Sequence, residues 1–359
     1  MTGHDLARGA AQASPYSFRR LSPVELPRLN EFHNRCRGTS RSVEEAEWLY
    51  ERNPYGETII LAAFDRDSEL VGIRPAVAWR FFRMGEERPA YQFVDAAVAP
   101  EHRGRGVFRH LVTMVCALAE EAEASLFSFP NESSLSIYLG VPALHCLGPC
   151  EVQAKILSWS RYMRYRLTRD AEDAGHGAVA AETAQLATGL RERDVSLEPI
   201  RAFESDFEEI HHDLGRRVAS FTLRRREFLN WRYFGRPHTR YHVALIRQSG
   251  RTRGYLVVRV RDAIAHLVDV FLAPDWEVAL AASRLVTRWA GAMGAIAIYF
   301  TASPGNFFHH AFRRGRLVLK RRSQPVVIDT STLNSLASRL RRRAGPGDFY
   351  FVMGDNDVL

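Results

Sequence analysis

The chain has 359 residues, of which 46% are hydrophobic and 25% charged, and its formal net charge at pH 7 is +8. This length exceeds one ordinary domain and favours two, and the composition is typical of a globular protein with sizeable cores. The positive charge favours anionic partners, but charge runs are usually solvated faces, so nucleic-acid binding is not the expectation.

Cysteine and histidine spacing argues against a disulfide framework and against a metal site. Four cysteines are too few for a disulfide scaffold at this length, and no Cys or His set has zinc-site spacing. His211-His212 and His309-His310 are adjacent pairs rather than ligands four residues apart. Because there is also no signal-peptide pattern and no apolar run of about 20 residues, we expect a cytoplasmic protein without membrane insertion.

Several short patterns occur twice in the same order along the chain. Trp48-Leu-Tyr-Glu-Arg-Asn-Pro54 and Trp231-Arg-Tyr-Phe-Gly-Arg-Pro237 share Trp, Tyr and Pro at the same spacing, and each precedes a hairpin signature. Val94-Asp-Ala-Ala-Val-Ala-Pro100 and Val268-Asp-Val-Phe-Leu-Ala-Pro274 then match, and each precedes a helix pattern and a short apolar strand. Repeated elements in one order indicate a duplicated unit.

The two repeats are separated by a segment rich in Ala, Gly and Glu, which is typical of a boundary. We predict a first domain over 15–165, a linker over 166–194 and a second domain over 195–359. The fold class predicted is α+β, with two tandem copies of a mixed, mostly antiparallel sheet flanked by helices. Residues 348–353 are expected to form a last strand that completes the second sheet.

Residues 93–111 predict a strand that ends at Pro100, a glycine-punctuated loop and a helix that begins near Val107. Free N–H groups at the start of such a helix favour an anion. Gly104 and Gly106 let a phosphate approach the main chain, and positive charge comes from the neighbouring side chains of Arg103 and Arg105. These features predict a diphosphate site, which is neither a Walker loop nor a dinucleotide fingerprint.

This segment resembles motif A of the GNAT acetyltransferase superfamily, in which a Val-x-Pro strand end precedes a loop with two conserved small positions. Gly104 and Gly106 match the motif, whereas Glu101 stands where the family prefers Gln or Arg. Residues 129–138 are similar to the family's next motif, with Asn131 and Tyr138 at its spacing, although the usual Gly-Phe after the tyrosine is missing. The resemblance implies a GNAT-like α/β fold over most of the first domain.

The resemblance also implies the site chemistry: an amine attacks the thioester of acetyl-CoA or another acyl-CoA, and no metal takes part. The backbone of Ala96 and Val98 is expected to pair with the pantetheine arm, and the Val98 N–H to stabilise the oxyanion. Tyr138 is the candidate general acid. The residues implied in cofactor binding are Ala96, Val98, Arg103, Gly104, Arg105, Gly106, Val107 and Asn131.

Asp95 is a candidate catalytic base or a ligand for the substrate ammonium. The alternative is a structural aspartate that pairs with an arginine in both domains, because Asp269 occupies the same place in the second repeat, where the glycine loop is replaced by Asp275-Trp-Glu-Val-Ala. The negative charges of Asp275 and Glu277 would repel a diphosphate, so the second copy is not expected to bind CoA.

The leading functional interpretation is an N-acetyltransferase acting on the primary amine of a small molecule or amino-sugar. One alternative is a Fem-like aminoacyl-tRNA-dependent transferase, which also has paired GNAT folds but generally lacks a CoA-type glycine loop. The other is a non-catalytic binding module in which both copies are degenerate. The sequence leaves the acceptor, the acyl length and the oligomeric state open, a homodimer included.

Overall fold

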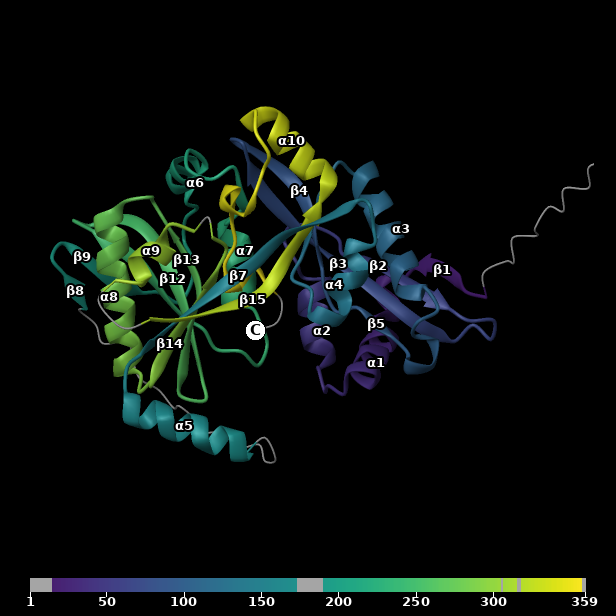
Figure 1. The fold of residues 1–359 in the computed structure, drawn as a ribbon, viewed down its shortest axis with the longest axis horizontal. Helices are drawn as coiled ribbons and strands as arrows, with labels where there is room; N and C mark the ends of the chain where they lie inside the picture. The colour runs from purple at the N-terminus through teal and green to yellow at the C-terminus, as the bar shows by residue number, and fades with distance from the viewer. Residues whose placement is uncertain (1–14, 173–189, 305, 315–317, 357–359) are drawn as a thin grey trace, which may run out of the picture.

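The computed structural model describes residues 15–172, 190–304, 306–314 and 318–356 (Figure 1). Within these residues, all sixteen strands belong to one mixed, mostly antiparallel sheet, and helices pack on both of its faces. The predicted α+β class is therefore confirmed.

In the first half, the antiparallel strands β2, β3 and β4 form the centre of the sheet. β2 is buried on both faces, because Ile60 and Ala62 pack with helix α1 while Leu61 and Ala63 pack with helix α3. A strand that is covered on both faces has a continuously apolar sequence rather than an alternating one. The elements are β1 (Ser17–Arg20), α1 (Leu26–Arg37), α2 (Val43–Tyr50), β2 (Ile59–Phe64), β3 (Leu70–Arg83), β4 (Glu86–Phe93), β5 (Ala97–Val98), α3 (Val107–Glu121), β6 (Ser125–Ser128), α4 (Glu132–Leu139), β7 (Leu144–Ile156) and α5 (Trp159–Glu172).

The second half follows the same general order of helices and strands. Its longest helix, α8, contributes a fully buried apolar stripe to the largest core cluster. The elements are β8 (Arg191–Glu192), β9 (Val195–Pro199), α6 (Glu208–Gly215), β10 (Ser220–Thr222), α7 (Arg226–Tyr233), β11 (His242–Gln248), β12 (Arg251–Arg261), β13 (Ile264–Leu272), α8 (Trp276–Ala292), β14 (Ala297–Ala302), α9 (Phe308–Phe312), β15 (Val318–Asp329), α10 (Thr330–Leu340) and β16 (Phe349–Tyr350).

Two long strands join the halves. The sheet runs in the order β1-β2-β3-β4-β6-β15-β7-β14-β13-β12-β11-β9-β8, so β15 of the second half lies between β6 and β7 of the first. β7 in turn pairs with β14, and the long strands β7 and β15 cross the centre of the molecule in Figure 1. The limits 15–165 and 195–359 stay predictions, but the sheet itself is continuous across them.

Two finer expectations concern the linker and the end of the chain. Much of the predicted linker, 166–194, lies outside the described residues, although its first residues continue α5 and its last include β8. Of the expected last strand at 348–353, only Phe349–Tyr350 forms a strand. It pairs in parallel with β10, which itself pairs with β3 of the first half, and Val352 forms an isolated antiparallel bridge with Ala302 of β14. The end of the chain therefore contacts strands of both halves.

The repeated tryptophans meet where the two halves contact each other. Trp48 Nε1 donates to the carbonyl of Trp231 at 2.9 Å, and Trp231 Nε1 donates to the carbonyl of Trp48 at 2.9 Å. Their rings stack with centroids 4.7 Å apart and an interplanar angle of 18°. Each tryptophan therefore makes the same contact with the other tryptophan, as two residues related by a two-fold axis do.

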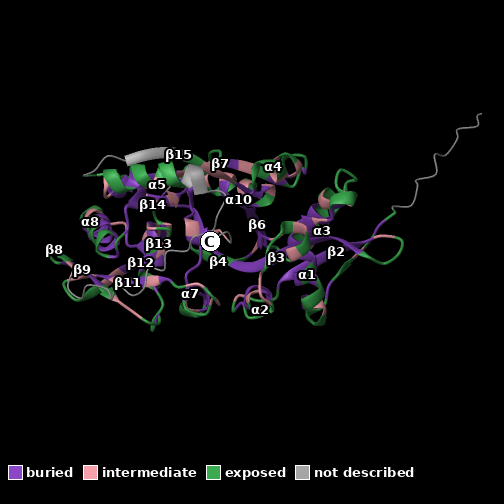
Figure 2. Ribbon diagram, turned by 90° about the horizontal axis from the view of Figure 1, so that it is seen from below, coloured by how far each residue is buried: buried purple, intermediate pink, exposed green. Residues whose placement is uncertain are grey.

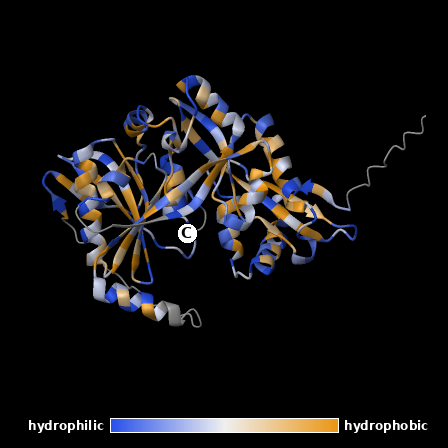
Figure 3. Ribbon diagram, viewed as in Figure 1, coloured by the Kyte–Doolittle hydropathy of each residue, from blue (hydrophilic) through white to orange (hydrophobic). Residues whose placement is uncertain are grey.

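The interior of both halves is mainly apolar. Figure 2 shows the strands of the sheet largely buried, and Figure 3 shows hydrophobic residues concentrated along them. None of the helices in the described part of the chain is long and apolar enough to cross a membrane. Among the same residues, no group of three or more His, Cys, Asp or Glu side chains is placed to hold a metal ion.

We expect Trp231→Ala to lower the free energy of unfolding by about 4 kcal/mol, because it removes a buried aromatic and one bond of the reciprocal pair. The matched control is Trp276→Ala, since Trp276 is 43% exposed; its effect should stay within about 0.5 kcal/mol. Chemical denaturation followed by circular dichroism measures both values. Equal small losses would show that the stacked pair does not couple the halves.

Candidate active site

The loop between β5 and α3 has the conformation that its glycines predict. Gly104 and Gly106 have φ angles of +73° and +82°, and a Cβ added at either would meet no atom within 4 Å. α3 begins at Val107, as predicted from the sequence. The backbone is therefore in the left-handed region at Gly104 and Gly106, and the space that a Cβ at either position would face is open.

The start of α3 is held against the sheet by close packing. A Cβ at Gly72 of β3 would lie 2.9 Å from Val107 Cγ1 and 3.4 Å from Leu111 Cδ1, so only glycine allows this approach. On the other side of the loop, the Tyr16 hydroxyl lies 3.0 Å from Nδ1 of His102. These contacts fix the position of the first turn of α3.

The first turn of α3 carries unpaired backbone donors beside positive charge. No acceptor within the described residues takes the N–H groups of residues 104–109. The side chains of Arg103 and Arg105 are exposed next to them, and Arg103 Nε donates to the Val98 carbonyl at 3.1 Å. Such a helix start attracts an anion, because its donors and its dipole act in the same direction.

Beside this loop, the fourth strand separates from its parallel neighbour. The pairing of β4 with β6 ends at Gln92 and Phe127, whereas Ala97 and Val98 pair with β3 alone. Since Ala99 N–H donates to Val71 at 3.0 Å, the alternation of an antiparallel pair turns the Val98 N–H away from β3. The backbone of Ala96 and Val98 thus lies at an opening in the strand pairing, between β5 and β6.

Tyr138 lies in the same part of the molecule, in helix α4. Its ring is 2% exposed, and its centroid lies 5.6 Å from that of Phe93 and 5.8 Å from that of Phe108. Its hydroxyl accepts a hydrogen bond from Nη2 of Arg74, whose guanidinium also stacks over Phe93 at 4.1 Å. A buried cation at a phenol oxygen favours the phenolate that remains once the proton has been given up.

Arg74 distinguishes the first half from the second. It follows Gly72 by two residues in β3, and the matching position after Gly254 in β12 is Leu256. Arg74 is 2% exposed and donates through Nη1 to the Val94 carbonyl at 3.3 Å. The sequence signal for this residue is an arginine within the otherwise apolar first part of β3, outside the family motifs.

Asn131 is the N-cap of α4. Its Oδ1 accepts from the Ser134 N–H at 3.0 Å and from the hydroxyls of Ser133 and Ser134. The side-chain oxygen is therefore engaged in capping the helix. Its Nδ2 makes no hydrogen bond to the described residues and is the group left for a ligand.

Asp95 lies in the bulge between β4 and β5, at a φ of +45°. Its carboxylate forms an ion pair with Arg41 and accepts from the Tyr50 hydroxyl at 2.5 Å, while His33 Nε2 lies 3.5 Å away. Burial alone raises the pKa of Asp95, but Arg41, His33 and Tyr50 outweigh burial and hold this pKa below its usual range. A carboxylate with a lowered pKa is a weak proton acceptor at neutral pH.

Asp269 has the same kind of partners in the second half. It pairs with Arg224 at 3.4 Å and accepts from the Tyr233 hydroxyl at 2.7 Å. Arg41 and Arg224 each stand seven residues before the repeated tryptophan, and Tyr50 and Tyr233 each stand two residues after it. The repeat thus encodes an Arg–Asp–Tyr cluster twice, which the shorter sequence pattern missed.

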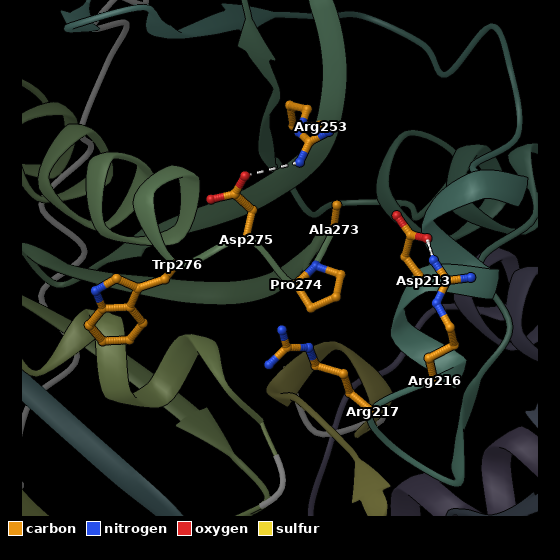
Figure 4. A pocket seen from close by; sticks show the side chains of 8 residues that line it. All are labelled: Asp213, Arg216, Arg217, Arg253, Ala273, Pro274, Asp275 and Trp276. Atoms are coloured by element: carbon orange, nitrogen blue, oxygen red, sulfur yellow. Dashed lines mark hydrogen bonds and ion pairs between the residues drawn. The ribbon is translucent and has the colours of Figure 1, made fainter.

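The second half has a different structure at the start of its corresponding helix, α8. Asp275 Oδ1 accepts from the N–H groups of Glu277 and Val278 at 2.9 and 3.2 Å, and Oδ2 pairs with Arg253 at 3.2 Å. Asp275 lines an open pocket of about 430 Å³, and Figure 4 shows Arg216 and Arg217 among the other residues that line it. The Asp275 carboxylate thus accepts from the first backbone N–H groups of α8, whereas the corresponding groups of α3 are left open.

The structure brings the predicted site residues into one region of the first half. Residues 96–107 form the open strand edge, the loop and the helix start, while Tyr138 is joined to the same strands through Arg74. Two other polar side chains near the site are engaged elsewhere: Gln92 Nε2 donates to the Asp355 carbonyl at 2.7 Å, and His102 contacts Tyr16.

Comparison with known proteins agrees with this geometry. Residues 17–139 match the family model of the acetyltransferase (GNAT) domain. No curated protein matches the chain by sequence. The match places a GNAT acetyltransferase domain in the first half of the chain.

Solved structures show the same fold at low sequence identity. A probable N-acyltransferase from Enterococcus faecalis V583 is 12% identical with a TM-score of 0.61, covering 87% of this chain and 72% of that one. A GCN5-related N-acetyltransferase from Anabaena variabilis is 13% identical with a TM-score of 0.60 and the same coverage. N-myristoyltransferase from Saccharomyces cerevisiae, with bound myristoyl-CoA, is 11% identical with a TM-score of 0.51, covering 88% and 82%.

We expect Asp95→Asn and Asp269→Asn to lower the free energy of unfolding at pH 7, Asp269→Asn by about 3 kcal/mol because its ion pair is buried, and Asp95→Asn by about 2 kcal/mol because its ion pair is partly buried. The lowered pKa of Asp95 means that its contribution is complete above the unfolded-state pKa and is lost as the pH falls through the folded one. The difference between wild type and Asp95→Asn should therefore shrink below about pH 3.9. Urea denaturation across a pH series measures it.

The comparison of Asp95→Asn with Asp269→Asn distinguishes a structural role of Asp95 from a catalytic one. A large loss of turnover in Asp95→Asn, with unchanged stability and a shifted pH–rate profile, would instead identify Asp95 as the catalytic base.

Proposed function

We propose that this protein is an acyl-CoA-dependent N-acyltransferase that transfers an acetyl group to the primary amine of a small molecule or amino-sugar. The observation that carries the proposal is the start of α3, where unpaired N–H groups and two arginines surround open space at Gly104 and Gly106. This arrangement suits the two phosphates of coenzyme A. The GNAT domain match supports acyl transfer from an acyl-CoA as the general class of reaction.

The opening between β5 and β6 is the proposed place for the pantetheine arm. The backbone groups of Ala96 and Val98 that face away from β3 have no partner strand among the described residues. They can therefore pair with the pantetheine arm as a neighbouring strand would, which would place the thioester beside β5. The Val98 N–H would then donate to the oxyanion that forms when the amine attacks the thioester carbonyl. Asn131 Nδ2 is a further candidate contact.

Collapse of the tetrahedral intermediate forms the amide and breaks the C–S bond, and the departing thiolate needs a proton. We assign this proton to the Tyr138 hydroxyl. Arg74 donates to the phenol oxygen, so the O–H can point elsewhere, and the positive charge stabilises the phenolate until it is reprotonated. The proton lost by the attacking amine leaves through a base that we do not assign to Asp95.

We propose a positioning role for Asp95. Its ion pair with Arg41 ties α2 and the preceding loop to the bulge from which β5 begins, and the second half repeats this cluster without an open phosphate loop. A feature that both halves share is better explained by the common fold than by the reaction. We further propose that the second half is a degenerate copy that does not bind CoA, because Asp275 caps α8.

Two other functions are less well supported. A Fem-like aminoacyl-tRNA-dependent transferase has no specific observation in its favour here. A non-catalytic binding module draws support from two departures from the family motifs, namely Glu101 and the missing Gly-Phe after Tyr138. Thermal stabilisation of the protein by acetyl-CoA, by aminoacyl-tRNA alone or by neither separates the three functions, and a comparison of acetyl-CoA with myristoyl-CoA tests the acyl length.

We expect Gly104→Glu to reduce the affinity for CoA by at least about a hundredfold, or ~2.7 kcal/mol, because it adds negative charge at the phosphates. Gly85→Glu is the matched control: Gly85 has a φ of +88° and open space around it, but it lies in the turn between β3 and β4. Titration calorimetry with CoA measures both variants. Undiminished affinity in Gly104→Glu, or equal losses in both, would refute the assignment of the phosphate site.

We expect Tyr138→Phe to lower turnover by about a hundredfold while acyl-CoA affinity changes little, because the phenol acts on the leaving thiolate. Tyr162→Phe serves as the control, since it also removes the hydroxyl of a buried tyrosine, one that contacts Tyr299 in the second half. Release of free thiol from acetyl-CoA with a panel of amines provides the rate. Unchanged turnover in Tyr138→Phe would exclude it as the acid.

A further inference from the structure

Helix α5 lies on the surface of the second half, away from the site described above (Figure 1). One of its faces is anchored to the body of the protein. Tyr162 is 5% exposed and packs with Ile264 and Ile296, and its hydroxyl lies 3.0 Å from that of Tyr299. Arg161 adds a hydrogen bond to the Gly294 carbonyl at 3.3 Å.

The opposite face of α5 exposes an apolar stripe, formed by Trp159, Met163 and Leu167. Their exposed fractions are 48%, 49% and 70%. Because they are spaced at i, i+4 and i+8, they lie within about 80° of one another around the helix. Scattered exposed apolar residues are normal on a protein surface, but an aligned set of large ones marks an interaction surface.

The stripe is bordered by positive charge on both sides. At about 100° per residue, Arg166 lies roughly 60° to one side of its centre and Arg164 roughly 100° to the other. Both side chains are exposed; residues 159–168 contain no acidic side chain, and the two acidic residues of α5, Asp170 and Glu172, follow in its last turn. This combination of an apolar face with tryptophan and arginine-rich flanks is typical of helices that lie in the interface of a membrane.

The corresponding helix of the other half shows that the fold does not require such an exposed stripe. α10 follows β15 as α5 follows β7, and its apolar residues are covered. Leu336 is fully buried, and Leu333 and Leu340 pack partly buried against the core of the first half. The stripe on α5 is therefore a property of that helix and not of the architecture.

We propose that α5 docks this protein peripherally on a membrane surface that contains anionic lipid. The apolar stripe enters the boundary between headgroups and acyl chains, while Arg164 and Arg166 contact the lipid phosphates at its flanks. The net charge of +8 draws the protein toward the same surface. Charge complementarity selects this occupant over a second copy of the chain, whose α5 would bring the same arginines together.

Flotation of the full-length protein with lipid vesicles tests the proposal, using phosphatidylcholine alone and phosphatidylcholine mixed with phosphatidylglycerol. We expect binding to the anionic vesicles that weakens with added salt. A variant with Trp159→Ser, Met163→Ser and Leu167→Ser should bind at least about tenfold more weakly, since it removes the buried apolar area. Arg164→Gln with Arg166→Gln should lose the preference for anionic lipid.

The control is Val24→Ser with Val43→Ser and Trp276→Ser, which removes three apolar side chains exposed elsewhere and should bind like the wild type. Circular dichroism verifies that each variant is folded. The proposal is overturned if the wild type fails to float with anionic vesicles, or if the stripe variant floats as well as the wild type. A dimer that the stripe variant disperses, without vesicle binding, would assign the stripe to a second copy instead. The assay needs no acyl-CoA, so its outcome is independent of the proposed reaction.

Discussion

The structure depends on the pairing of β7 with β15. Each strand arises in one half of the chain and completes the sheet of the other, since β15 separates β7 from β6 while β7 also borders β14. Neither half can close its sheet without the other, so we expect the two halves to fold as one unit. The reciprocal tryptophan contacts add a second connection with the same symmetry.

This shared architecture contains two helix starts that differ in chemistry. Before α3, two left-handed glycines leave the first backbone donors open, and Gly72 lets the helix approach β3 closely. Before α8, the carboxylate of Asp275 accepts hydrogen bonds from the first donors itself. Arg74, which is Leu256 in the second half, adds a buried cation only where the open loop and Tyr138 are also present. The chemistry proposed for this protein therefore belongs to one half, and the scaffold to both.

The Arg–Asp–Tyr clusters illustrate how a repeat separates structural from reactive residues. A carboxylate in an apolar strand indicates a functional group when only one copy is considered. When both copies are compared, the same three residue types recur at matching positions and make the same contacts. Helices α5 and α10 show the opposite case, a difference between corresponding elements. The apolar residues of α10 are covered, whereas the apolar stripe of α5 is exposed.

The sequence by itself determined the α+β class, the duplicated order of patterns, the glycine loop and the start of α3 at Val107, because periodicity, turn residues and helix boundaries are local properties of the chain. It also identified Tyr138 and Asp95 as residues of interest, but not their partners Arg74, Arg41 and Tyr50. The tertiary structure alone decided those partners, the insertion of β15 between β6 and β7, and the exposure of the α5 stripe. These features join segments that are far apart in the chain, and many pairings satisfy the same local pattern, so only packing of the whole chain selects one of them.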